Sequence, residues 1–301
     1  MALGSIVAGA IGTQYIKTFE ENVIHLAQQK ASKLRNTVTN KPTGALSHSF
    51  RVTGARGAMT AKGSQGINGG KYQTTTMTNQ VYNDRIAIPA GFYSADTYEW
   101  DDVPKMLADP ESILVQSMAA QVGREIDKVI VAAFLATATD TQGTASLDFL
   151  TANTVTSAAG VFALADVISV NELMLLADID PDEEKFLVVP PRAVSKLLNE
   201  TKATSSDYVN LRTLQGNGTI KNFMGFTWIV SNLLNVPSAN HRYCMAYTKD
   251  AIGLAITKEP FVDVAKDPSH QFATVVQVAM DLGAVRIQDA KCFRIDMADN
   301  A

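Results

Sequence analysis

Residues 109–137 read DPESILVQSMAAQVGREIDKVIVAAFLAT, and the central helix of the protein is predicted here. It begins with the strongest helix-start signal in the chain: Asp109 supplies a capping acceptor, Pro110 suits the first helical position, and Glu111 faces the positive end of the helix dipole. Apolar residues then recur at spacings of four, at Leu114, Met118, Val122, Ile126, Ile130 and Phe134. This pattern predicts a helix over residues 109–137, about 40 Å long. Since each step of four advances about 400°, the apolar stripe drifts round the axis, and we expect the two helix ends to pack on different neighbours.

The segment before this helix has a one-sided charge pattern. No Asp or Glu lies between Glu21 and Asp84, whereas eight basic residues do: Lys30, Lys33, Arg35, Lys41, Arg51, Arg56, Lys62 and Lys71. From Asp84 to the end of the chain the net charge is about −11. Glycines crowd residues 54–70 and large apolar residues are few, so this segment cannot bury itself. We expect this segment either to stay disordered or to pack on another molecule. A basic arm joined to an acidic globular body suits a chain that binds copies of itself.

The remaining periodicities predict an α+β protein. An amphipathic helix is expected over residues 15–34, a long two-stranded ribbon with a flexible tip between Ser47 and Ala90, and a second internal helix over residues 164–176. A buried strand at 186–189 and a helix from Pro190-Pro191 to Asn199 follow. Further strands are predicted at 223–230, 243–256, 272–280, 284–287 and 291–295, with turns at Gly283 and at 288–289. Helices come early, strands come late, and no βαβ unit repeats.

Composition excludes several classes of protein. The 301 residues allow one large domain or two smaller ones, and the net charge of −4 with a pI near 5.6 argues against nucleic-acid affinity of the whole molecule. Cys244 and Cys292 are the only cysteines, and we expect both to be reduced and buried. The chain starts without a cationic signal-peptide region and contains no apolar run of about twenty residues, so we expect an intracellular product with no membrane partner.

Residues that could carry catalysis or bind a metal are scattered. His25, His48, His241 and His270 fall in unrelated elements, and no HExxH, GxSxG or phosphate-loop motif occurs. The acidic run 178–184 starts like a calcium loop, but Glu183 stands where glycine is required and Val189 where glutamate is required, which favours an acidic turn. The sequence therefore predicts no catalytic, cofactor-binding or metal site.

Five short motifs follow one another along the chain, and both their order and their spacing are informative. They are Asp-Arg-x-Ala-Ile-Pro at 84–89, Asp-Pro-x-Ser at 109–112, Gly-Arg-Glu-x-Asp at 123–127, a Gly-Phe strand running into Ser-Asn at 225–233, and Gly-Ala-Val-Arg at 283–286. In this order and spacing the chain resembles the major capsid proteins of tailed double-stranded DNA bacteriophages, which have the Hong Kong 97-type fold. The resemblance covers nearly the whole chain.

The resemblance implies a division into parts. These are an N-arm (1–42), an extended loop in the form of a β-hairpin (43–90), a peripheral domain (91–160) with its spine helix (109–137), an axial domain (161–255), and C-terminal strands of the peripheral domain (256–301). It also implies a structural subunit, not an enzyme and without cofactors, that assembles as hexamers and pentamers into an icosahedral shell in the host cytoplasm and ends in the virion. Implied partners are a portal protein and packaged double-stranded DNA bound without sequence specificity.

Two further features follow from the resemblance. The family's fused scaffolding segment is missing here, which implies a separate scaffolding protein or earlier proteolysis. Some relatives crosslink through a loop lysine, and Lys62 and Lys71 lie in the corresponding loop, but no partner asparagine can be matched.

The charge pattern and the resemblance together give an interface hypothesis. Basic residues of the loop would lie over the acidic approach to the spine helix of an adjacent subunit, each exposed pair contributing under ~1 kcal/mol. The basic set is Arg51, Arg56, Lys62 and Lys71, and the acidic set is Glu99, Asp101, Asp102, Asp109 and Glu111.

Three alternatives stay open at the level of sequence. Within the same fold, the chain could be the shell protein of an encapsulin-type bacterial nanocompartment. It could also be an α+β enzyme whose site forms only through tertiary contacts. Finally, the basic segment could be a nucleic-acid arm, although Phe50, Tyr72 and Tyr82 are the only aromatic residues there to stack on bases.

Overall fold

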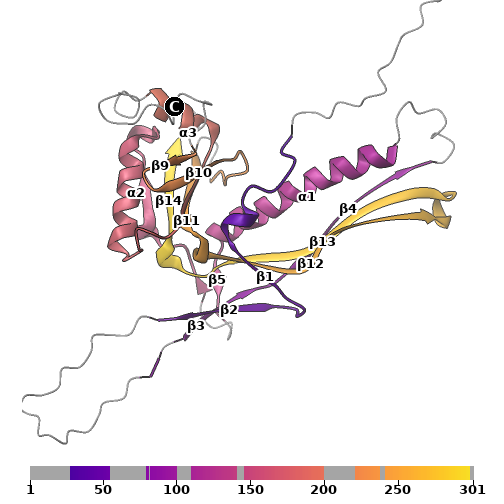
Figure 1. Cartoon of the computed structure of the whole chain (residues 1–301), viewed down its shortest axis with the longest axis horizontal. Coiled ribbons are helices and arrows are strands. Elements are labelled where there is room, and N and C mark those ends of the chain that lie inside the picture. Colours follow the sequence, from indigo (N-terminus) through magenta and orange to yellow (C-terminus); the bar gives the residue numbers. More distant parts are fainter. Residues whose placement is uncertain are drawn as a thin grey trace, which may run out of the picture.

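Most of the described strands belong to two large sheets, and one long helix runs along the first of them (Figure 1). The computed structural model describes residues 28–54, 79–80, 82–99, 110–140, 146–199, 221–237 and 241–298. In Figure 1 helix α1 lies along the long curved ribbon of β4, β12 and β13, and the second sheet, with α2 and α3, lies near the C-terminal end of α1.

The first sheet has four strands in the order β1 (Thr39–Pro42), β12 (Ile252–Asp267), β13 (Ala273–Arg286) and β4 (Ala90–Tyr98). Strand β1 runs parallel to β12, and the other pairs are antiparallel. Helix α1 (Pro110–Leu135) covers this sheet, so the prediction from the 109–137 stretch is confirmed.

The two ends of α1 pack on different neighbours, as the drift of its apolar stripe predicted. Near the N-terminal end, Met118 packs with Val276 and Val278 of β13. Further along, Ile130 and Phe134 belong to a larger core that also includes residues of β8, β11, β12 and β14. The C-terminal part of the helix therefore packs against both sheets.

The second sheet has six strands and its own hydrophobic core. Its order is β7 (Thr154–Thr156), β14 (Cys292–Ala298), β11 (His241–Thr248), β8 (Lys185–Val189), β10 (Phe226–Val230) and β9 (Asn222–Phe223). Helices α2 (Leu164–Leu176) and α3 (Pro191–Asn199) stand where the sequence placed them and pack into this core. Every residue of β8 is buried, including Lys185, and this burial explains the apolar run from Phe186 to Val189.

Smaller elements complete the described fold. Strands β2 (His48–Thr53) and β3 (Tyr82–Ala87) pair antiparallel, as predicted for the ribbon between Ser47 and Ala90. Strands β5 (Ala138–Thr139) and β6 (Ser146–Leu147) form a second short pair. Short 3-10 helices are η1 (Arg35–Thr37), η3 (Thr151–Asn153), η4 (Ala158–Gly160), η5 (Lys249–Ala251), η6 (Pro268–His270) and η7 (Asp289–Lys291).

The helix predicted over 15–34 is wrong in the part that the structure describes. Residues 28–34 have no regular helix and lead into η1, because their polar groups bond to the side of α1. Residues 15–27 of that prediction lie outside the described residues, as do the threonines at 74–78 of the predicted ribbon.

Glycine 283 does not form a turn as predicted. Strand β13 continues through it without a break, and a Cβ on Gly283 would lie 2.4 Å from the carbonyl oxygen of Ile88. The glycine is therefore needed for a close approach of two backbones.

The other strand predictions differ from the structure in where the strands begin and end, and in which sheet they join. The 223–230 strand is a hairpin of β9 and β10 whose turn at Met224 and Gly225 has positive φ angles of 53° and 78°. The segment 243–256 holds the end of β11 and the start of β12, and β12 continues to Asp267. The strands of 256–301, predicted as one group, belong to two sheets, since β14 pairs with β11 and β7.

Candidate functional site

The segment before β1 is fastened to helix α1 at one buried carboxylate. Asp127, which has no exposed surface, accepts hydrogen bonds from the backbone N–H groups of Lys33 and Leu34, both at 3.1 Å, and from the hydroxyl of Ser32 at 2.6 Å. The side-chain amide of Gln29 donates a further bond. Donors on four residues thus converge on the Asp127 carboxylate. These hydrogen bonds hold residues 28–34, which have no helical structure, against α1.

Two other residues of the Gly-Arg-Glu-x-Asp motif shape this contact, which we call the arm clasp (residues 28–34 on Gly123, Arg124 and Asp127). A Cβ on Gly123 would lie 2.8 Å from backbone atoms of Ala31 and Ser32, so only glycine lets the arm lie so close to the helix. Arg124 donates to the side-chain oxygen of Gln28 at 2.8 Å and to the carbonyl oxygen of Gln29. The Gly-Arg-Glu-x-Asp motif therefore fixes the direction in which residues 28–34 approach helix α1.

The extended ribbon is anchored at its base by an aromatic contact. Phe50 of β2 is buried and packs on Gly253 of β12, where a Cβ would lie 2.6 Å from its ring. The ring of His48 stacks edge-on against Phe50, with centroids 4.6 Å apart. We call the β2–β3 pair and these contacts the loop base.

Arg51, the first residue of the predicted basic set, forms an ion pair within its own chain. Its guanidinium donates to both carboxylate oxygens of Asp84 across the ribbon, at 3.0 and 3.2 Å, and lies 5.6 Å from the ring centroid of Tyr82. The hydrogen bond and the charge of Asp84 raise the pKa of Arg51 above its usual value. The side chain of Arg51 is largely exposed, so this pair contributes little to stability.

The loop base is tied to the end of helix α1 by a buried arginine. Arg286, which is fully buried, donates to the carbonyl oxygens of Phe134 and Leu147 at 2.8 Å, to that of Ala136 at 3.0 Å, and to the carboxylate of Asp289.

The other oxygen of Asp289 accepts from Arg85 of β3 at 3.1 Å. The carbonyls of Phe134 and Ala136 belong to the last turn of α1 and the residues after it, which need donors. We call Arg85, Arg286 and Asp289 the arginine hub. It links β3, the end of α1 and the turn between β13 and β14.

Most of the predicted interface residues fall outside the described part. Glu99 is exposed just after β4, and Arg51 is paired as above. Arg56, Lys62, Lys71, Asp101, Asp102 and Asp109 lie outside the described residues, as does the side chain of Glu111. The contact between loop and spine helix therefore stays a prediction.

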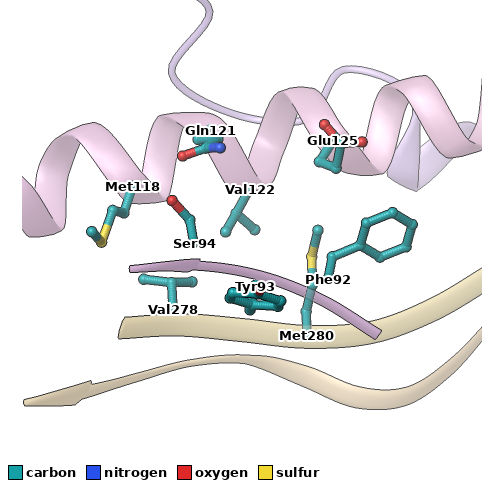
Figure 2. Close-up of a pocket in the computed structure, with 9 residues that line it drawn as sticks. All are labelled: Phe92, Tyr93, Ser94, Met118, Gln121, Val122, Glu125, Val278 and Met280. Atoms are coloured by element: carbon teal, nitrogen blue, oxygen red, sulfur yellow. The ribbon is translucent and has the colours of Figure 1, made fainter. Parts of the chain in front are cut away.

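The groove shown in Figure 2 lies between α1, β4 and β13 and has a volume of about 240 Å³. Apolar side chains of Val122, Val278 and Met280 line it together with polar ones, Ser94 and Gln121 among them. Its one carboxylate, Glu125, accepts from Lys128 at 2.7 Å. The groove therefore offers both apolar and polar surface.

In the part of the chain that the structure describes, no group of three or more His, Cys, Asp or Glu side chains could hold a metal ion. Instead His241 bonds Asp296 at 3.0 Å and His270 bonds Asp267 at 2.6 Å, while His25 lies outside the description. The acidic run 178–184 is a turn between α2 and β8, as predicted.

The two cysteines are free and buried, as predicted, and burial raises the pKa of Cys292. No described helix has both the length and the apolar character needed to span a membrane.

Sequence reasoning missed the roles of Asp127 and Arg286, although both lie in motifs that it singled out. A signal was present in each case. Asp127 interrupts an apolar helix beside Ile126, and Arg286 follows the apolar run of β13. A charged residue at such a position is expected to be buried with partners.

Comparison with known proteins gives a family and a fold. A profile described as phage capsid protein matches residues 11–299. The fold is similar to the capsid of cyanophage P-SCSP1u, with a TM-score of 0.74 and 16% identity over 95% of this chain and 93% of that one. It is also similar to a structure from Mycobacterium phage Che8 (TM-score 0.70, 12% identity, 94% and 97% covered) and to the capsid asymmetric unit of cyanophage Pam1 (TM-score 0.70, 13% identity, 99% of each covered).

No curated protein sequence matches the chain. At such low identities the structural likeness shows the Hong Kong 97-type fold, and the family rests on the sequence profile, which spans nearly all residues. With a body built around α1, an anchored ribbon and a clasped arm, the chain belongs to the phage capsid protein family and is a structural, shell-forming subunit of the virion.

Proposed function

We propose that copies of this chain assemble, as hexamers and pentamers, into the icosahedral shell that encloses the double-stranded DNA genome of a tailed bacteriophage. The observation that carries this proposal is the match of the phage capsid protein profile to residues 11–299. The parts assigned by resemblance, from N-arm to C-terminal strands, belong to the same proposal.

The loop base supports the proposal because it presents the ribbon away from the body. In Figure 1 strands β2 and β3 extend away from both sheets, below the C-terminal end of α1. Phe50 and the arginine hub hold the ribbon at its root, so its direction is set before any partner is met. A preset direction lowers the entropic cost of reaching a neighbour. Contacts repeated round a closed shell then reinforce one another.

The electrostatic part of the proposal concerns the basic residues of the loop. Arg56, Lys62 and Lys71 would lie over the acidic approach to the spine helix of an adjacent subunit, at Glu99, Asp101, Asp102, Asp109 and Glu111. Arg51 contributes less than these three, because its charge is compensated by Asp84 in the same chain.

The proposed partners follow from the same role. The shell would contain a portal protein, assemble in the host cytoplasm with a separate scaffolding protein, and hold DNA without sequence specificity. A net charge of −4 suits a container that must release its contents, because a surface that bound phosphate tightly would impede packing and release.

Electron microscopy of the purified chain in negative stain tests the proposal. We expect closed shells tens of nanometres wide, alone or after addition of a scaffolding protein from the same source. Shells that carry a protein cargo and no portal would instead support the nanocompartment alternative. A compact monomer under all these conditions would overturn the proposal.

A further inference from the structure

A basic pocket lies beside the arm clasp, between residues 28–33, helix α1 and the residues that follow β10. In Figure 1 this part of the arm is the indigo segment beside α1. The pocket has a volume of about 740 Å³, and three of its lining side chains are cations, Lys30 and Lys33 of the arm and Arg124 of α1. None of its described lining residues is acidic or aromatic, and Leu233 is the one large apolar side chain among them. We call this concavity the arm pocket.

The cations of the arm pocket keep N–H donors that their own chain does not use. The guanidinium of Arg124 is held in place because its Nη1 donates to the side-chain oxygen of Gln28 at 2.8 Å and to the carbonyl oxygen of Gln29 at 3.3 Å. Its Nε and Nη2 donate to no described residue, although a guanidinium carries five N–H donors. Lys33 uses one of its three donors, on the carbonyl oxygen of Val230 at 2.7 Å. Arg124 is therefore positioned for a ligand before the ligand arrives.

The described carboxylates near the arm pocket do not cancel its charge. Asp127 lies under the arm, but it is one negative charge against three positive ones, and its oxygens accept from the donors of the arm clasp. Glu125, next to Arg124 in the sequence, pairs with Lys128 at 2.7 Å. The pocket therefore keeps an excess of positive charge. Lysine ammonium groups together with a planar guanidinium fork are the donor set that binds phosphate.

The side chains that the arm pocket lacks indicate where the phosphate comes from. Without aromatic groups among its described lining residues the pocket has nothing to stack on bases, and without a cluster of large apolar groups it lacks the anchors of a protein interface. Contacts to phosphate alone carry no sequence information. We propose that the arm pocket binds a backbone phosphate of the duplex DNA inside the shell, through Lys30, Lys33 and Arg124. This inference rests on the proposed shell function and assigns the arm clasp to the inner wall.

A site of this kind is weak in a single subunit. Each cation that meets a phosphate is worth at most roughly 8-fold in affinity in about 0.1 M salt, because about one condensed counterion is released. The acidic remainder of the chain does not add to this attraction. Repetition of the site round a closed shell therefore positions the DNA without impeding its release.

Binding at the arm pocket is coupled to the arm clasp. Two of the three cations lie on the arm and one lies on α1, so a phosphate that contacts all three binds only while the arm is clasped. A ligand that binds one of two states stabilises that state. Duplex DNA should therefore slow proteolytic cleavage within residues 28–34. Inorganic phosphate at the same phosphate concentration should protect the arm less, because a free ion has no condensed counterions to release.

Binding of a short fluorescent DNA duplex to the unassembled subunit, followed by anisotropy, tests the site. Lys30 is exposed, so Lys30→Gln should fold normally. We expect it to weaken binding about 5-fold in about 0.1 M salt and to lower the slope of log affinity against log salt concentration by about 0.9, as for one lost phosphate contact. Lys30→Arg should bind like the original chain. Arg192→Gln on α3 removes the same charge outside the pocket and should change the affinity less than ~2-fold. Equal losses for Lys30→Gln and Arg192→Gln would overturn the inference.

Competition identifies the ligand. If poly-glutamate displaces the duplex as well as unlabelled DNA of equal charge does, the pocket belongs to an acidic protein segment and the inference fails. If inorganic phosphate protects the arm as well as DNA does, the ligand is the free ion and the inference also fails. Failure of DNA to bind or to protect the arm would overturn the site while closed shells in the microscope still supported the shell function. If no shell forms from the unsubstituted chain, the proposed function itself fails.

Discussion

Asp127 shows how one side chain can replace a secondary-structure element. Its carboxylate is buried without a cation among its hydrogen-bond partners, and its charge is balanced by donors of the arm, two of which are backbone N–H groups. The N–H of Leu34 would otherwise be buried without an acceptor. The arm can therefore leave the helical conformation that its own apolar spacing favours.

Replacing this carboxylate should release the arm. We expect Asp127→Ala to lower the free energy of unfolding by roughly 2–4 kcal/mol, because the substitution leaves buried donors unpaired. Urea denaturation measures the loss, and limited proteolysis should show faster cleavage within residues 28–34. Glu125→Ala on the same helix is the control, since among the described residues Glu125 pairs with the exposed Lys128, and its loss should cost well under ~1 kcal/mol. Equal losses for the two variants would show that the arm clasp is not what Asp127 stabilises.

Cys292 links stability to alkaline pH. Burial raises the pKa of its thiol above the ordinary value of 9.0, so the folded chain keeps a proton that the unfolded chain loses. Stability from this group is complete below the unfolded pKa and declines as the pH rises from there toward the folded pKa, by at most about 1.4 kcal/mol per pH unit.

Urea midpoints at pH 8, 9 and 10 should therefore fall, and Cys292→Ala should flatten the fall between pH 9 and 10. Tyr247, whose pKa burial also raises, begins to contribute only above about pH 10 in the same way. Parallel curves for Cys292→Ala and the original chain would exclude this origin.

At the scale of elements, the close crossing at Gly283 joins the loop base to the main sheet. Strand β13 passes beneath Ile88 and Pro89, which follow β3 directly, and no side chain fits between them. Gly283→Ala must push these backbones apart, so we expect a loss of roughly 2 kcal/mol or more and faster hydrogen exchange in β2 and β3. Gly44→Ala, where a Cβ meets nothing within 4 Å, should be neutral in both measurements. Unchanged exchange in the ribbon would mean that the crossing does not position it.

The same element shows why some predictions from sequence fail. Helices α1, α2 and α3 and strand β8 follow from local signals, a cap, a proline or an apolar period, that act within the element itself. A glycine within an apolar strand can mark a turn or a crossing, and only the position of Ile88 decides between them. Residues 28–34 have helical spacing, yet the acceptor that unwinds them lies on α1, 93 residues away from Leu34.

The residues of the candidate site also divide into those that the sequence predicts and those that only the fold brings together. The excess of basic residues in the loop and the acidic stretch before α1 are visible in composition, because charge patterns need no tertiary structure to be recognised. The arginine hub was not predicted, since Arg85, Arg286 and Asp289 belong to three separate elements and meet only in the fold. Arg51 was placed in the interface set on its charge alone, and its pairing with Asp84 depends on the register of β2 against β3.

At the scale of the whole molecule, the arm (residues 28–34) and strand β3 are both fixed to helix α1. The arm clasp holds residues 28–34 near the middle of α1, and the arginine hub holds β3 at the end of that helix. Hydrogen bonds therefore link both segments to α1, the arm directly and β3 through Asp289 and Arg286. Such coupling suits a subunit whose neighbours on different sides must be engaged in one geometry.

A charge exchange tests how one subunit engages the next. Reversing Arg56, Lys62 and Lys71 together to Glu should raise the concentration needed for shell formation at least ~10-fold, because several weak pairs per subunit are lost and replaced by repulsion. Light scattering measures the threshold, and electron microscopy distinguishes shells from aggregates. The effect should shrink in high salt, which screens exposed pairs.

The decisive variant adds the opposite reversal, Glu99→Lys, Asp101→Lys and Asp102→Lys, to the first three. If the two sets meet across the subunit boundary, the variant with all six substitutions assembles again, since the loop glutamates then face the three new lysines. A loop that acts instead through net charge would show no recovery beyond that of three lysines placed elsewhere on the acidic body. Recovery specific to these positions requires that the sets lie opposite each other, because exposed charges separated by more than about 10 Å are screened in 0.1 M salt.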